Sequence, residues 1–91
     1  MSISPAIDLT ETGSTAIFTT SSVGETEIHI SNMDNMVAKV IVKVDPISTE
    51  TQTILIGEEK IIRRKCEGLD LEVKNGNGAA IIVWVVLAEN E

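Results

Sequence analysis

The feature that most constrains this chain is an alternation of apolar and polar side chains with a period of two residues. It runs through residues 25–32, 37–45 and 69–74, where Ile, Val and Thr are frequent. Successive side chains of a β-strand point to opposite faces, so this pattern buries one face of a strand and leaves the other in solvent. No segment of useful length has the 3.6-residue spacing of an amphipathic helix. The sequence therefore predicts an all-β chain.

Turn signals separate these segments and set the expected architecture. Pro46 cannot donate a hydrogen bond to a sheet and should end a strand, while Gly24, Gly57 and Gly68 mark further breaks. About six to eight short strands in one chain predict a small antiparallel β-sandwich, either jelly-roll or immunoglobulin-like. We assign a single β-sandwich domain to residues 16–91. Residues 1–15 are expected to form an N-terminal arm or an extended segment, because they show little local pattern.

The strongest local signal is the run Asn75-Gly76-Asn77-Gly78, which lies between two hydrophobic segments. Asn-Gly pairs supply the positive φ angles that a type I′ turn requires. We therefore expect a C-terminal β-hairpin from Leu69 to Ala88, with either Asn-Gly pair at its tip.

The last predicted strand, residues 80–87, is apolar on both faces. One alternate set of its side chains can fill the core, and the other then points to solvent, where a monomeric sandwich normally carries polar residues. A contiguous apolar stripe of about 300 Å² marks an interface, unless a loop or the N-terminal segment covers it. The predicted protein interface consists of Ile82, Trp84 and Val86, extended by Val37 and Ile41 if their strand lies next to this one.

Composition excludes several classes of partner. Fourteen acidic and seven basic residues give a formal net charge of −7, which repels the phosphates of nucleic acids and anionic membranes. Phe18 and Trp84 are the only aromatic residues, too few for a base-stacking or sugar-stacking surface. The N-terminus lacks the basic and apolar regions of a signal peptide, so we expect a product that stays in the cytoplasm where it is made. The longest apolar run is about half as long as a membrane-spanning helix requires.

Residues capable of chemistry are few. His29 is the single histidine and Cys66 the single cysteine, which excludes a multi-histidine metal site and a cysteine cluster. We expect His29 to be an exposed strand residue and Cys66 a small half-buried one, although Arg63, Arg64 and Lys65 offer a way to lower the pKa of the thiol. The acidic residues lack EF-hand spacing. The expectation is a protein without catalytic residues, metal or cofactor, and thus not an enzyme.

The order of segments resembles that of the small β-sandwich structural proteins of tailed bacteriophage virions. In many of these an Ile-x-Ile-x-Asn strand precedes a Val-rich strand, and a Val-rich strand ending in Glu closes the chain. Here Glu67-Gly68 replaces the usual Gly-Asp step before the penultimate strand, and aromatic residues are scarcer. The segments that carry the resemblance are Ala16–Thr20, Glu27–Asn32, Ala38–Val44, Leu69–Lys74 and Ala80–Glu89.

The resemblance implies a non-enzymatic virion structural protein that is made in the host cytoplasm. Its expected role is that of a capsid decoration (cement) protein, which stabilises the head by bridging neighbouring capsid subunits. The implied partners are further copies of the chain, in a homotrimer or a symmetric array, and the major capsid or tail protein. Two alternatives stay open: a small tail, neck or fibre component of the phage, and a cellular β-sandwich binding module.

Overall fold

The computed structural model describes residues 2–88, and within them it contains nine β-strands and no helix. Accordingly, no helix in this part of the chain is long and apolar enough to cross a membrane. The strands are β1 (Ser2–Ile3), β2 (Ile7–Leu9), β3 (Thr15–Thr19), β4 (Thr26–Asn32), β5 (Ala38–Val44), β6 (Ser48–Ile54), β7 (Glu59–Arg64), β8 (Asp70–Asn75) and β9 (Ile81–Leu87).

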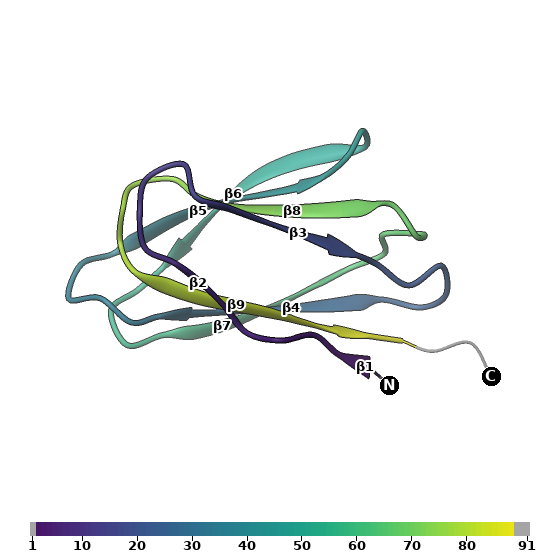
Figure 1. Cartoon of the computed structure of the whole chain (residues 1–91), viewed down its shortest axis with the longest axis horizontal. Helices are drawn as coiled ribbons and strands as arrows, with labels where there is room; N and C mark the ends of the chain where they lie inside the picture. The colour runs from purple at the N-terminus through teal and green to yellow at the C-terminus, as the bar shows by residue number, and fades with distance from the viewer. Residues whose placement is uncertain (1, 89–91) are drawn as a thin grey trace.

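The strands form two antiparallel sheets that face each other (Figure 1). The first sheet has the order β1/β2–β9–β4–β7 and the second the order β3–β8–β5–β6. If β1 and β2 are counted as one interrupted strand, the sandwich has eight strands. Numbered in chain order, these strands have the order 1-8-3-6 in the first sheet and 2-7-4-5 in the second sheet. This is the strand order of a jelly roll. The predicted β-sandwich is confirmed, and of its two open topologies the structure has the jelly roll.

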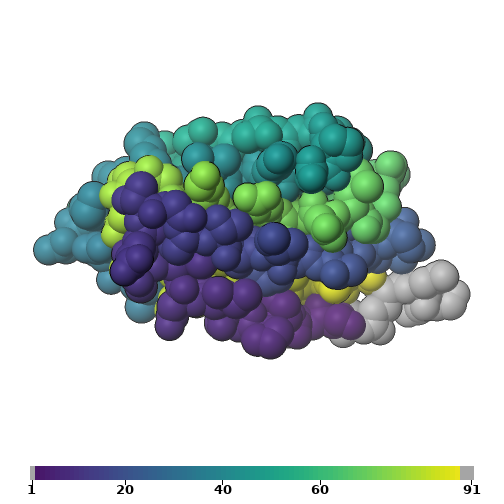
Figure 2. Space-filling view, turned by 45° about the horizontal axis from the view of Figure 1, so that its top comes forward, coloured from purple at the N-terminus to yellow at the C-terminus, as the bar shows by residue number. Residues whose placement is uncertain are grey.

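The N-terminal segment belongs to the first sheet, where β1 and β2 both pair antiparallel with β9. Their registers differ by one residue, since Ile3 faces Val86 whereas Ile7 faces Val83, and the extra residue lies at Pro5-Ala6. Such a β-bulge tolerates proline, which has no N–H to give to the ladder. Figure 2 shows this purple segment lying along the yellow C-terminal strand. The structure thus places β1 and β2 at the edge of the first sheet, beside β9.

The hydrophobic core lies between the sheets and consists of the apolar side chains on their facing sides. The alternation predicted for β4, β5 and β9 is present: every second residue of each strand is buried, except that Leu87 at the end of β9 is only partly buried. Full burial of one Val, Leu or Ile side chain stabilises the fold by roughly 1.5–3 kcal/mol. The core includes Leu9, Phe18, Ile28, Ile30, Val40, Val42, Ile54, Leu71, Val73, Ile81, Val83 and Val85.

The connection from β8 to β9 crosses from one sheet to the other, so the predicted hairpin from Leu69 to Ala88 was wrong. The buried side chain of Asn75 organises this crossover. Its Nδ2 donates to the carbonyl oxygens of Leu9 (3.0 Å) and Ala79 (2.8 Å), and its Oδ1 accepts from the N–H groups of Asn77 (3.1 Å) and Gly78 (2.7 Å). These bonds hold the Asn-Gly run in a turn between layers instead of a turn within one sheet.

Gly76 allows a close approach of this crossover to β5. Its N–H donates to the Lys39 carbonyl at 2.7 Å, and a Cβ at this position would lie 2.9 Å from the same oxygen. Any side chain would therefore displace the backbone from β5. The glycine that favoured a hairpin turn in the sequence instead serves a contact with a strand of the second sheet.

The crossover from β4 to β5 is built in the same way around a second buried asparagine. Asn32 ends β4, and its Nδ2 donates to the carbonyl oxygens of Met36 (2.9 Å) and Ile54 (3.0 Å). Its Oδ1 accepts from the N–H of Asp34 (2.9 Å). The carboxylate of Asp34 then accepts from the N–H of Ala80 at 2.9 Å, which joins the two crossovers.

We expect Asn75→Ala to lower the free energy of unfolding by about 2–4 kcal/mol, because it leaves two carbonyl oxygens and two N–H groups without their partner. Urea denaturation measures this loss. Asn35→Ala is the matched control, since Asn35 is an exposed asparagine in the other crossover. Equal unfolding midpoints for the two variants would contradict the role given to Asn75.

Candidate functional site

The predicted interface residues do not form one surface. Ile82, Trp84 and Val86 lie on the outer face of β9 and are half-buried. Val37 lies in the crossover between β4 and β5, and Ile41 lies on β5 in the opposite sheet. The neighbours of β9 are β4 and the N-terminal strands, so the condition for extending the stripe is not met. The predicted extension by Val37 and Ile41 was wrong.

Trp84 is flanked on this outer face by a row of side chains from neighbouring strands. His29 of β4 is its cross-strand partner, and Ile61 of β7 is the partner of His29 on the other side. The rings of His29 and Trp84 stack with centroids 5.0 Å apart and an angle of 18° between their planes. Stacking of this kind removes part of both rings from water. The side chain of His29 is therefore only 13% exposed, whereas the sequence predicted an exposed histidine.

Charged groups surround the His29 ring. Its Nε2 lies 3.1 Å from Oε1 of Glu27, and its Nδ1 lies 3.6 Å from Oε1 of Glu59. Arg63 donates from Nε to Oε2 of Glu27 at 3.3 Å. The hydrogen bond from His29, with a further contribution from Arg63, lowers the pKa of the Glu27 carboxyl group. The outer face of the first sheet thus carries an apolar and aromatic row with ion pairs beside it.

Cys66 lies beyond β7 and is fully buried. Burial raises the pKa of its thiol, and this effect outweighs the attraction of the neighbouring Arg64. The thiol is therefore not activated by the basic residues beside it, and the predicted half-exposure was wrong. In the part of the chain that the structure describes, no three metal-ligating side chains form a group.

Five of the nine large apolar residues that are exposed in the described part of the chain gather at one end of the sandwich, which we call the apolar end. Two loops form it, one between β4 and β5 and the other between β6 and β7, at the left of Figure 1. The loops lie side by side because Nδ2 of Asn32 bonds a carbonyl at each of them. The exposed fractions of its large apolar residues range from 37% to 60%. The apolar end consists of Met33, Met36, Val37, Leu55 and Ile56.

Sequence reasoning identified Val37 alone among these residues. A signal was present, because turns normally carry Gly, Asn, Asp, Ser or Pro, whereas both loops also hold large apolar residues. Only the crossover, which brings residues 33–37 next to residues 55–56, makes one patch of them.

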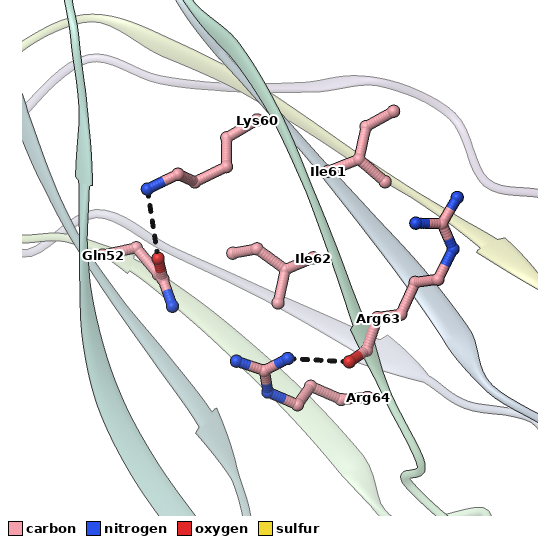
Figure 3. A pocket seen from close by; sticks show the side chains of 6 residues that line it. All are labelled: Gln52, Lys60, Ile61, Ile62, Arg63 and Arg64. Atoms are coloured by element: carbon pink, nitrogen blue, oxygen red, sulfur yellow. Dashed lines mark hydrogen bonds between the residues drawn. The ribbon is translucent and has the colours of Figure 1, made fainter.

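A widely open hollow of about 380 Å³ lies on one side of the sandwich, between the edge strands β6 and β7 (Figure 3). Lys60 and Arg64 point across it toward β6, while Ile61 and Arg63 point the other way. Lys60 donates to the Thr53 carbonyl at 2.9 Å, and Arg64 donates to both carboxylate oxygens of Glu50. These bonds tie the two edges together across the open side of the sandwich.

Comparison with models of known protein families, with curated proteins and with solved structures gave no match.

The apolar end depends on an ionised carboxylate. Asp34 accepts hydrogen bonds from the N–H groups of Ala80 (2.9 Å) and Asn35 (2.8 Å), and these bonds lower the pKa of its carboxyl group in the folded protein. A lowered folded pKa adds stability above the unfolded pKa, and this stability is lost as the pH falls through the folded pKa.

We therefore expect Asp34→Asn to flatten the loss of stability below about pH 4. Urea unfolding midpoints measured from neutral to acidic pH test this. The wild-type midpoint should fall more steeply in acid than that of the variant. A residual slope is expected in both, because the pKa values of Glu27 and Glu50 are lowered as well. Parallel curves would show that Asp34 makes no such contribution.

Proposed function

We propose that this chain is a non-enzymatic structural protein of a tailed bacteriophage virion, a capsid decoration protein that bridges neighbouring capsid subunits. The proposal rests on the segment order described above and on one structural observation, the apolar end. Five large apolar side chains are exposed together on a chain whose formal net charge is −7. Contiguous exposed apolar surface of this kind marks a site of protein contact.

The fold supports a mechanical role for the apolar end. Its two loops are held by buried hydrogen bonds of Asn32 and by the carboxylate of Asp34, so the patch is presented on a preorganised frame. Little conformational entropy is then lost when a capsid surface covers it, which favours tight binding.

The outer stripe of β9 supports the second part of the proposal, contact between copies of the chain. Ile82, Trp84 and Val86 are half-buried in one copy and available for further burial in an assembly. Tryptophan is a frequent anchor of protein interfaces. In this proposal the chain assembles on itself, with a trimer as the expected form, and binds the major capsid protein through the apolar end.

Capsid binding is tested with empty capsids assembled from the major capsid protein encoded in the same genome. We expect the wild-type chain to co-sediment with them and the double variant Met33→Ser/Leu55→Ser to bind at least about tenfold more weakly, since it removes two apolar anchors. Ile17→Ser is the matched control, because Ile17 is 65% exposed on β3, outside the apolar end. Failure of the wild-type chain to co-sediment, or equal loss in the control, would reject the proposal.

Self-association through β9 is tested with Trp84→Ala. The variant should keep a folded sandwich and lose about 2 kcal/mol or more of association free energy, because truncation of a buried interfacial tryptophan removes a large apolar contact. Light scattering over a concentration series measures the association, and circular dichroism checks the fold. If the variant unfolds as an isolated chain, Trp84 acts as a core residue and does not anchor an interface.

A further inference from the structure

Strand β7 is the free edge of the first sheet. The N–H of Asn32 donates to the Glu58 carbonyl at 3.0 Å, which makes this a hydrogen-bonded position of the β4–β7 ladder. Hydrogen-bonded and non-hydrogen-bonded positions alternate along antiparallel strands. In the register of β4 and β7, the backbone N–H and C=O groups of Glu59, Ile61 and Arg63 therefore point away from β4. They form a row of donors and acceptors along the edge.

The side chains of the same three residues lie on the outer face and are exposed. Ile61 is 44% exposed, and the side chains of Glu59 and Arg63 are 50% and 55% exposed. Their order along the strand is acidic, apolar, basic. A strand with this order is complementary to its own antiparallel copy, because reversing the direction exchanges the acidic and the basic end.

We propose that β7 is a docking edge for a second copy of this chain, which adds its own β7 antiparallel across a two-fold axis at Ile61. In this register Ile61 faces Ile61 of the second copy, and Glu59 faces Arg63 of the second copy. The outward N–H and C=O groups of all three residues acquire partners, which joins the two first sheets into one continuous sheet. The inference goes beyond the virion proposal and does not depend on it.

The charge pattern selects this register over its neighbour. The residues next to the three named ones also match, since Glu58 falls opposite Arg64 of the second copy. The smallest shift that keeps the outward backbone groups of both strands facing each other is two residues, because these groups alternate along the strand. A shift of two residues places Lys60 opposite either Lys60 or Arg64 of the second copy, and like charges directly across a ladder are unfavourable. The two-fold register is therefore specified by both the charges and the backbone.

The pairing also extends the row of side chains that contains Trp84. Trp84, His29 and Ile61 lie side by side across β9, β4 and β7. Two copies related by the axis place this row end to end with its counterpart, with the two Ile61 side chains in contact at the centre. Exposed apolar area at Ile61 is then removed from water, which adds to the backbone hydrogen bonds.

Lys60 and Arg64 do not obstruct this edge. Charged side chains that point inward on an edge strand commonly prevent such pairing. Here both point to β6, where the ammonium of Lys60 is bound by the Thr53 carbonyl and the guanidinium of Arg64 by Glu50. Arg64 also donates from Nη1 to the Arg63 carbonyl at 2.7 Å, and that oxygen keeps a second lone pair for the partner strand.

A charge-exchange series tests the proposal by sedimentation equilibrium over a concentration series. The wild-type chain should form an even-numbered assembly: a dimer through β7 alone, or a hexamer if the trimer proposed for the β9 stripe forms as well. The single variants Glu59→Arg and Arg63→Glu should each raise the dissociation constant at least about tenfold, because they place like charges across the axis. The double variant Glu59→Arg/Arg63→Glu should restore association. Circular dichroism confirms that each variant is folded.

Two control variants change the net charge by the same amounts far from the edge. Glu72→Arg and Lys43→Glu lie on β8 and β5 of the second sheet and should leave association unchanged. Amide hydrogen exchange gives an independent measurement: the N–H of Ile61 should be protected in the assembly and exchange rapidly in the dissociated chain. A wild-type monomer at all concentrations, or a wild-type trimer unaffected by the single variants, would overturn the proposal.

Discussion

The structure depends on satisfying the backbone where the chain leaves one sheet for the other. At such a crossover the N–H and C=O groups lose their strand partners, and leaving them buried and unpaired is costly. Asn32 and Asn75 solve this problem at the ends of β4 and β8, because one carboxamide carries two donors and an acceptor with two lone pairs. Through Asp34 and Ala80 the two crossovers also hold each other. The jelly-roll strand order follows from these connections.

The apolar end is a consequence of the same crossovers. Asn32 bonds carbonyl groups of two loops, and this brings Met33 and Met36 next to Leu55 and Ile56. The outer stripe on β9 has a different origin, since it arises from a strand that is apolar on both faces and stacks Trp84 on His29. The apolar end lies in two loops at one end of the sandwich, whereas the β9 stripe and the free edge of β7 lie along the first sheet. The contact proposed with a capsid and the contacts proposed between copies therefore use different surfaces.

The sequence predicted the faces of single strands well and the relations between strands poorly. The inward residues of β4, β5 and β9 follow directly from alternation, because side chains of a strand point to opposite faces whatever the strand pairs with. The predicted hairpin failed because Asn-Gly specifies a turn but not whether the next strand stays in the sheet. Ile41 was assigned to the wrong surface for a related reason: its outward orientation was correct, but β5 belongs to the opposite sheet.

The amino-acid sequence by itself determined the all-β character, the antiparallel sandwich and the residues that face its core, since each follows from local periodicity. Only the tertiary structure decided that the N-terminal strands complete the first sheet, that two buried asparagines set the crossovers, and that five apolar loop residues form one patch. The physical reason is that these features join residues far apart in the chain, such as Asn75 and Leu9. Hydrogen bonds of that kind leave no periodic pattern in the sequence.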